Sequence, residues 1–263
     1  MKSLAVVLAV LTYNVHGLDA WVVDDDPVAR MPAISSRLNA YDVALIQETW
    51  TYYDAMAAQA THPVKERGSG PHPGTFLQTG LATFARPAFA ALSRGSLGAC
   101  SGWLGGANDC LADKGYLRMR LRLSNGAVVD FWTLHLDAGD GTGDRAARAV
   151  QLANLEARVR SLSGDAALVV GGDFNSAAEE PRDVELLQAF ASHLGLADSG
   201  ARAAADGRFA AKHIDYVFVR SGTTAALRVV ETGEAREFER DGKPLSDHPA
   251  LFARLEVTPL SGP

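Results

Sequence analysis

The chain has 263 residues, of which 47% are hydrophobic and 21% charged, and its net charge is -6 at pH 7 with a pI of about 5.6. This composition is that of a globular protein with a sizeable core, and we expect residues 1–263 to form one domain. The negative charge argues against general nucleic-acid binding, because phosphate backbones attract basic surfaces, although a local basic patch remains compatible with it. No apolar run reaches the length of a membrane-spanning helix.

The N-terminal residues superficially resemble a signal peptide, with Lys2 ahead of an apolar run. They lack a small-residue cleavage site, and they continue directly into Tyr13-Asn14-Val15-His16-Gly17, so that cleavage would remove a core strand. We therefore expect a cytoplasmic protein from the chain as given, and an exported one if a signal peptide was trimmed from a longer precursor.

Strands and helices alternate in the first half of the chain. We expect a buried strand over residues 4–15, and then a helix to about Asn39 with Asp26 as its cap and Pro27 at its first position. The later segments of this half are a strand over 43–46, a short helix over 52–60, a loop over 62–74, strands over 80–86 and 88–92, and a long Gly-rich loop over 93–113.

The second half continues this alternation. Residues 116–123 predict a half-exposed strand with Arg118, Arg120 and Arg122 on one face, and Asn125-Gly126 is typical of a hairpin turn. The remaining segments are strands over 127–136, 166–171, 213–220, 225–231 and 249–257, helices over 144–161 and 183–193, and loops or hairpins over 201–207 and 233–245. Several strands are apolar on both faces, which indicates an α/β sandwich of two packed sheets covered by helices.

The two cysteines, Cys100 and Cys110, flank the Gly-rich loop. They could form a small disulfide or remain two buried thiols, and the sequence leaves both alternatives open. Their spacing is not that of a zinc site.

Polar side chains recur at or beside the ends of the apolar strands. In residues 169–176, two glycines after an apolar run lead to Asp173 and Asn175, which would point to the same side of an extended strand. The other groups of this kind are Asn14, Glu48, His135, Asp215, Asp247 and His248. Each alone has a structural explanation, such as a turn acid or a satisfied core histidine. Together they would be costly at a packed sheet edge unless they bound each other or a ligand.

Some of these groups suit a divalent cation. Glu48, with Asn14 and Asp247, offers the hard oxygen ligands that Mg²⁺ or Mn²⁺ prefers. Too few protein ligands are present for a closed cage, which suits Mg²⁺ because it keeps waters and takes substrate phosphate.

The other groups suit hydrolysis of a phosphoester. Asp215 can orient His248, which then removes a proton from the attacking water. Asp173 can position that water, while Asn175 and His135 can donate to the phosphoryl oxygens where charge develops. A metal-bound phosphoester hydrolase without a Ser or Cys nucleophile accounts for the whole set.

Six stretches resemble the endonuclease/exonuclease/phosphatase superfamily, which includes DNase I, abasic-site endonucleases, inositol-polyphosphate 5-phosphatases and neutral sphingomyelinases. They occur in the family order and are Thr12-Tyr13-Asn14, Leu45-Ile46-Gln47-Glu48-Thr49, Thr133-Leu134-His135-Leu136, Gly172-Asp173-Phe174-Asn175, Ile214-Asp215-Tyr216 and Ser246-Asp247-His248-Pro249. The resemblance implies a four-layered, DNase I-like α/β sandwich, in which two mainly antiparallel sheets pack face to face with helices outside. It also implies that Glu48 is the principal metal ligand, that Asn14 lies close to it, and that Asp215 pairs with His248.

Further stretches are similar to the neutral sphingomyelinase branch. They are residues 80–86, residues 109–117, and residues 133–137 followed by Arg148 and Gln151. Lys114-Gly115 is either a simple loop-to-strand turn or part of the substrate site, and Lys114 is our candidate substrate-binding residue. The aromatic, membrane-inserting hairpin of secreted bacterial sphingomyelinases has no counterpart, because residues 234–243 hold one aromatic and many charges. Trp103 could replace it, although a single Trp in such a loop more often packs locally.

We therefore expect a Mg²⁺-dependent phosphodiesterase, similar to a sphingomyelinase or phospholipase C, that acts as a monomer on a phosphodiester such as a phospholipid headgroup. A DNase I-like nuclease is one alternative and would need a basic groove, for which Arg118, Arg120 and Arg122 are the best candidates. An inositol-polyphosphate-type phosphatase is another and would need a Lys/Arg cluster facing the site. The intact set of candidate catalytic residues disfavours a binding protein without activity.

Overall fold

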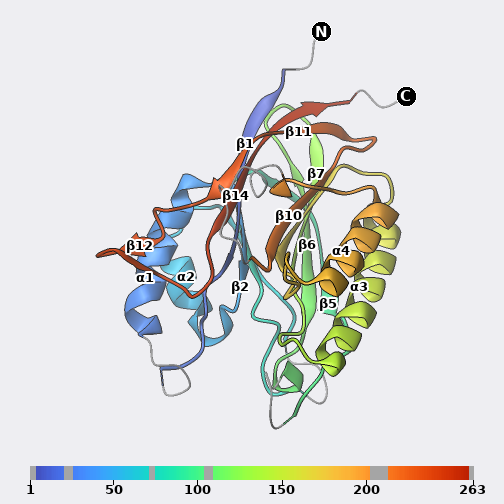
Figure 1. Cartoon of the computed structure of the whole chain (residues 1–263). Coiled ribbons are helices and arrows are strands. Elements are labelled where there is room, and N and C mark those ends of the chain that lie inside the picture. The colour runs from blue at the N-terminus through green and yellow to red at the C-terminus, as the bar shows by residue number, and fades with distance from the viewer. Residues whose placement is uncertain (1–3, 21–25, 71–74, 104–108, 202–212, 261–263) are drawn as a thin grey trace.

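The computed structural model describes residues 4–20, 26–70, 75–103, 109–201 and 213–260. Two six-stranded sheets lie face to face at the centre, with α1 and α2 outside one sheet and α3 and α4 outside the other (Figure 1). The predicted four-layered α/β sandwich is confirmed. Within the described part of the chain, no helix is long and apolar enough to cross a membrane.

The first sheet combines strands from both ends of the chain. Its strands, in spatial order, are β11 (Ala225–Glu234), β14 (Leu251–Pro259), β1 (Val6–Asn14), β2 (Val43–Gln47), β4 (Ala82–Ala85) and β3 (Val64–Arg67). Only β1 and β2 are parallel among these neighbours. The outer face carries α1 (Pro27–Arg37) and α2 (Tyr53–Ala58), with short 3-10 turns at Leu38–Ala40 and Trp50–Tyr52.

The second sheet has the same plan. Its strands, in spatial order, are β5 (Ala88–Ser96), β6 (Gly115–Arg122), β7 (Val128–His135), β8 (Leu168–Asp173), β10 (Asp215–Arg220) and β9 (Ala197–Asp198). Only β7 and β8 are parallel. Helices α3 (Thr142–Ser163) and α4 (Pro181–Leu194) cover the outer face of this sheet, and a 3-10 turn spans Asp109–Leu111. A separate hairpin is formed by β12 (Glu239–Arg240) and β13 (Lys243–Pro244).

Burial on both faces explains why β1 lacks an apolar/polar alternation. Leu8 and Val10 join the core between the two sheets, while Leu11 and Tyr13 pack on the side of α1. A strand that is covered on both sides reads as a continuous apolar run.

Several predicted boundaries change in the structure. The loop predicted over 62–74 contains the edge strand β3, whose weak apolar pattern reflects a half-exposed edge. Asp26 caps α1 as predicted, since its carboxylate accepts the N–H of Ala29 at 3.0 Å. The helix predicted to begin at Asp144 begins at Thr142, and Asp144 lies in its first turn, where its carboxylate accepts the N–H of Gly141 at 3.0 Å. Almost all of the loop predicted over 201–207 lies outside the described residues.

The two cysteines form a disulfide, with their Cα atoms 5.1 Å apart. The bond closes the loop that joins β5 to β6. Nearby side chains anchor this loop to α3, since Gln151 donates to the carbonyl of Ala99 at 2.7 Å and Asn154 to that of Leu97 at 2.9 Å.

Candidate active site

The predicted polar groups meet at one edge of the packed sheets, and the parallel strand pairs account for it. Asn14 ends β1 and Glu48 directly follows β2, while His135 and Asp173 end β7 and β8 opposite each other. Because the carboxyl ends of parallel strands lie at the same edge, each pair delivers two polar side chains together. Asp215 begins β10, which runs antiparallel to β8, and therefore also lies opposite Asp173.

Asn14 connects the two sheets. Its amide nitrogen donates to Glu48 Oε1 at 3.0 Å and to Asp173 Oδ2 at 2.9 Å, while its oxygen accepts the N–H of His16 at 3.0 Å. Asn14 thus lies close to Glu48, as expected, and acts here as the donor between two carboxylates. Its role as a metal ligand stays a prediction.

The backbone at Glu48 is strained in a way that aims its carboxylate at this edge. Its φ is +61°, a value that few L-residues adopt. The N–H of Gly17 donates to the Glu48 carbonyl at 2.9 Å, and a Cβ on Gly17 would lie 2.1 Å from that oxygen. Only glycine lets the two loops approach this closely.

The cluster of Glu48, Asp173 and His135 has the donor set of a divalent-cation site. His135 Nε2 lies 3.7 Å from Glu48 Oε1 and 3.7 Å from Asp173 Oδ2, and one ligand atom from each residue lies within 4.8 Å of the others. Both acids are largely removed from water, and Asn14 contributes only a neutral donor, so a bound cation would offset their charge. These residues therefore fit a divalent metal ion.

Burial raises the pKa of Glu48 to about 7, with Asn14 and Lys114 opposing the shift and Asp173 adding to it. Because a cation competes with that proton, we expect the apparent affinity for Mg²⁺ to fall about tenfold per pH unit below 7. Isothermal titration calorimetry at pH 6, 7 and 8 measures this change. In the matched control Glu48→Gln we expect no measurable Mg²⁺ binding at any of the three pH values, and binding that keeps the pH dependence of the wild type would contradict the assignment to Glu48.

His248 and Asp215 pair as predicted. His248 Nδ1 lies 2.7 Å from Asp215 Oδ2, and its Nε2 faces Asp173 Oδ2 at 3.8 Å. Burial alone would lower the pKa of His248, but Asp215, Asp173 and Asp247 outweigh it and raise the pKa to about 10. Burial also raises the pKa of Asp215. The pair therefore holds a proton tightly in the absence of a cation.

Asn175 lies beside Asp173 but has left the strand. Its φ is +48°, its N–H donates to Asp173 Oδ1 at 2.9 Å, and its side-chain amide donates to the Leu136 carbonyl at 2.9 Å. An amide NH₂ has two hydrogens, so one remains for a ligand.

Lys114 and His135 form a buried pair next to Glu48. Lys114 Nζ lies 3.2 Å from His135 Nε2 and 2.6 Å from Asp109 Oδ1. Burial, with Lys114 and His248, lowers the pKa of His135 well below its ordinary value. Since an ammonium group can only donate, the neutral ring accepts at Nε2 in this arrangement, and this nitrogen would have to give up Lys114 before it could bind a cation.

Asp247 lies at the outer side of the edge. Its side chain is 57% exposed, and its Oδ1 lies 3.4 Å from Nδ1 of His16. Among the described residues, two compact groups of acidic and histidine side chains could hold a metal ion. One group is Glu48, His135 and Asp173, and the other is Asp173, Asp215 and His248. Asp247 belongs to neither group. Sequence reasoning missed His16, whose only signal was its position two residues after Asn14.

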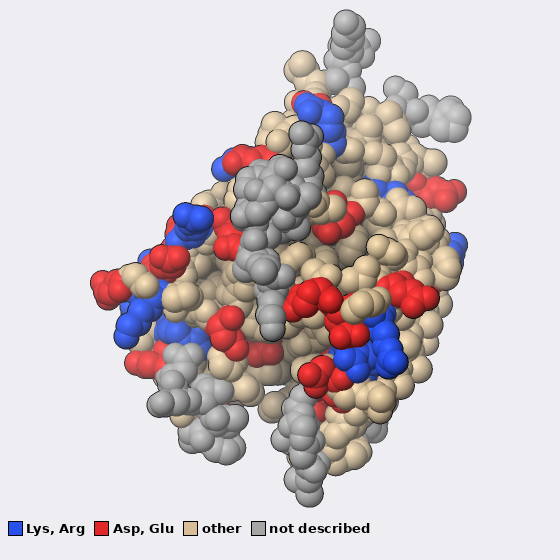
Figure 2. All heavy atoms as spheres, in the orientation of Figure 1, with Lys and Arg blue, Asp and Glu red and all other residues tan. Residues whose placement is uncertain are grey.

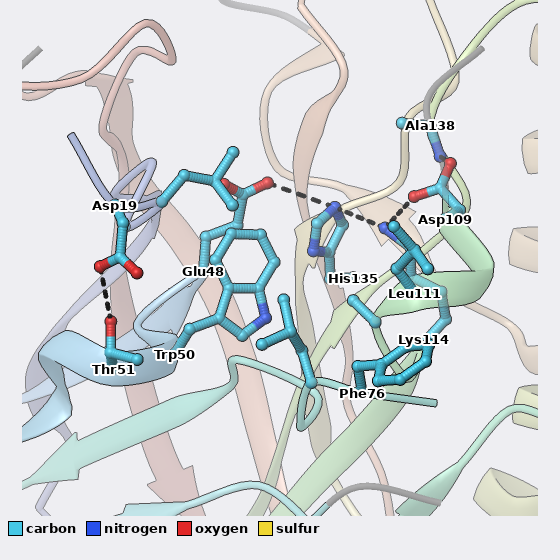
Figure 3. A pocket seen from close by; sticks show the side chains of 14 residues that line it. Asp19, Glu48, Trp50, Thr51, Phe76, Asp109, Leu111, Lys114, His135 and Ala138 are labelled. Atoms are coloured by element: carbon cyan, nitrogen blue, oxygen red, sulfur yellow. Dashed lines mark hydrogen bonds and ion pairs between the residues drawn. The ribbon is translucent and has the colours of Figure 1, made fainter. Parts of the chain in front are cut away.

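A cavity of about 520 Å³ opens beside Glu48 and His135. Figure 3 shows Glu48, His135 and Lys114 together on one side, with Trp50 and Phe76 among the side chains around the space. The apolar walls of the cavity also include Leu18, Leu77 and Leu111, and its acidic groups besides Glu48 are Asp19 and Asp109.

A sequence profile of the Endonuclease/Exonuclease/phosphatase family matches residues 11–248. The chain belongs to this family. Curated sphingomyelinases of Mycobacterium tuberculosis and Mycobacterium bovis are 30% identical to it over 263 residues, which is 91% of this chain and 51% of theirs. The chain thus spans about half the length of these relatives.

Solved structures of the family share the fold at low identity. Beta toxin from Staphylococcus aureus, a F277A, P278A mutant with bound magnesium ions, has a TM-score of 0.69 at 16% identity over 94% of this chain and 98% of its own. Sphingomyelinase C from Streptomyces griseocarneus has a TM-score of 0.66 at 17% identity, over 94% of this chain and 99% of its own. TDP2 from D. rerio complexed with a single-strand DNA product has a TM-score of 0.73 at 17% identity, over 95% of this chain and 98% of its own. The family's description, Endonuclease/Exonuclease/phosphatase, covers enzymes that hydrolyse phosphoric esters.

Proposed function

We propose that the chain is a Mg²⁺-dependent phosphodiesterase of the sphingomyelinase-like branch. The observation that carries this proposal is the His248–Asp215 pair facing Asp173 at the edge where Glu48 and His135 gather beside an apolar cavity. A phosphodiester at this edge would have its phosphorus between a base on one side and the carboxylate cluster on the other.

In this proposal, each residue of the site has a separate role in the in-line attack of water on the phosphorus. Asp215 fixes the tautomer of His248, so that Nε2 takes the proton of a water positioned by Asp173. A divalent cation held by Glu48, with Asn14 and Asp247 as further candidate ligands, would stabilise the phosphoryl charge and lower the pKa of His248 by offsetting the nearby carboxylates.

Neutral and cationic donors would then bind the phosphoryl oxygens. Asn175 offers its remaining amide hydrogen, and Lys114 offers an ammonium close to His135. His135 was predicted as a donor itself, but its Nε2 faces the Lys114 ammonium. We therefore assign the donor role at this position to Lys114, with His135 holding its side chain.

The cavity favours a substrate with an apolar substituent. Its walls are mostly hydrophobic, and Lys114 is the only Lys or Arg among the described residues that line it. An inositol polyphosphate would need several cations there. A lipid phosphodiester needs one phosphate-binding group and apolar walls, which is what this cavity offers.

The nuclease alternative loses its best candidates. Arg118 is buried, and it donates to Asp130 at 2.9 Å, while Arg120 donates to the same carboxylate at 2.7 and 2.9 Å. Figure 2 shows acidic and basic side chains interspersed on the face in view, with its largest basic patch directly beside acidic side chains. These two arginines are therefore occupied by Asp130, and the third candidate, Arg122, is exposed but does not form a basic groove alone.

The proposal is tested by hydrolysis of bis-p-nitrophenyl phosphate, sphingomyelin vesicles and plasmid DNA, each with Mg²⁺ and with EDTA. We expect Mg²⁺-dependent turnover of the first two. Turnover that persists in EDTA, or none on any phosphodiester, would overturn the proposal, and plasmid nicking that falls steeply with salt would favour the nuclease.

Phe76 gives a sharper test of the lipid assignment, because it lines the cavity and is 77% exposed. We expect Phe76→Ala to raise KM for sphingomyelin about tenfold, the value of one aromatic contact, and to leave bis-p-nitrophenyl phosphate hydrolysis unchanged. Phe89→Ala, at an exposed aromatic on β5 outside the cavity, is the matched control. Equal KM values for sphingomyelin in both variants would argue against this wall as a substrate contact.

A further inference from the structure

A buried arginine of α1 joins two loops that are distant in the sequence. Arg30 is 6% exposed, and its guanidinium donates to the carbonyls of Val15 at 2.9 Å, His16 at 2.9 Å and Leu245 at 2.6 Å. Val15 and His16 follow β1, whereas Leu245 lies just after β13. One side chain thus holds the backbone of both loops together.

These two loops carry opposite sides of the candidate active site. Val15 directly follows Asn14, which binds the carboxylates, and Leu245 directly precedes the segment 246–248, which ends at His248. Ser246 makes a second connection between the same two loops. Its hydroxyl donates to the Asn14 carbonyl at 2.8 Å and accepts the N–H of His248 at 3.3 Å.

Arg30 also stabilises an unfavourable backbone conformation. His16, whose carbonyl it binds, has a φ of +49°, a left-handed value that is uncommon for residues other than Gly. That turn directs the N–H of His16 to Asn14 Oδ1 at 3.0 Å and its ring toward Asp247 at 3.4 Å. Loss of the guanidinium would therefore weaken the contacts of His16 with both Asn14 and Asp247.

Only a guanidinium suits this position. Its planar fork reaches several carbonyls at once from a fixed geometry, whereas an ammonium is a single point on a flexible stem. We propose that Arg30 is a positioning residue that sets the distance between Asn14, with the carboxylates it binds, and His248. This inference rests on the proposed phosphodiesterase function, in which the base and the carboxylate cluster act on one phosphate.

The test compares two arginines of the same helix. Arg30→Met keeps the aliphatic stem and removes the donors. Arg37→Met is the matched control, because the Arg37 guanidinium also donates to carbonyls, those of Glu237 at 2.6 Å and Glu239 at 3.0 Å, but these belong to the charged hairpin. Arg30→Lys keeps the charge and the stem, and it serves if Arg30→Met does not fold.

With bis-p-nitrophenyl phosphate and Mg²⁺ we expect Arg30→Met to lower kcat about a hundredfold, as expected for a displaced reacting group, with KM changed less than about threefold. Arg30→Lys should have a kcat about tenfold below that of the wild type, and Arg37→Met should have the kcat of the wild type. Equal kcat values for the folded Arg30 variants and Arg37→Met would overturn the inference.

A second measurement does not depend on turnover. The Nδ1–H of His248, which faces Asp215 Oδ2 at 2.7 Å, should give a downfield proton signal that is protected from exchange and absent in His248→Gln. We expect Arg30→Met to shift or broaden this signal and Arg37→Met to retain it. If the wild type hydrolyses no phosphodiester, the proposed function fails, and an unchanged signal in Arg30→Met separately overturns the positioning role.

Discussion

His248→Gln will lower kcat for bis-p-nitrophenyl phosphate about a thousandfold, within the range for loss of a general base, and will change KM little. Glutamine retains a donor toward Asp215 but has no group that accepts a proton at this pH. The buried pair, with His248 Nδ1 2.7 Å from Asp215 Oδ2, leaves Nε2 as the only ring nitrogen directed at the site. Steady-state kinetics at saturating Mg²⁺ measure the loss.

His193→Gln is the control for this variant. His193 also pairs with a carboxylate, at 3.0 Å from Glu156, but it lies on α4 with its side chain 59% exposed. We expect its kinetics to equal those of the wild type. Full activity in His248→Gln would show that another group activates the water.

Glu48→Gln will abolish Mg²⁺-dependent turnover, yet it will stabilise the protein in EDTA. A buried carboxyl with its folded pKa raised to about 7, against 4.5 when unfolded, favours folding less once pH rises above both values. At pH 8 the ionised carboxylate therefore costs the folded state on the order of 3 kcal/mol. A neutral glutamine of the same shape avoids this cost and still accepts from Asn14.

Urea unfolding at pH 5 and pH 8, with EDTA and with Mg²⁺, separates these effects. The gain in free energy of unfolding should appear in EDTA at pH 8 and vanish at pH 5, where wild-type Glu48 is protonated. Mg²⁺ should stabilise the wild type but not the variant. The control is Glu156→Gln. Burial alone would raise the pKa of Glu156, but the hydrogen bonds and charges of His193 and Arg160 together outweigh it and lower the pKa, so removal of this carboxylate should not increase the free energy of unfolding.

The architecture was predictable because it depends on patterns within single segments. Continuous apolar runs indicate strands that are buried on both faces, and polar groups at their ends indicate an edge with a function. The pairing of Asp215 with His248 followed from the family resemblance. Even here the local argument had a limit, since the extended backbone ends at Asp173 and the positive φ of Asn175 breaks the alternation.

Contacts between distant segments were not predictable. The alternation in β6 predicted Arg118, Arg120 and Arg122 on one half-exposed face, but only Arg122 is exposed. The register with β7 places Arg120 opposite Asp130, whose carboxylate binds Arg118 and Arg120. The Lys114–His135 contact and the three carbonyls held by Arg30 also depend on how loops meet after the sheets pack. No periodicity in the sequence reports on such loop geometry.

The pairing of β1 with β14 has a consequence for folding. Val6 lies opposite Val257, so this pairing joins two segments that are far apart in the sequence. His248 lies just before β14, and the other catalytic groups are synthesised earlier. Contacts of such long range slow folding. We therefore expect His248 to join the other candidate catalytic groups only when β14 pairs with β1 and completes the first sheet.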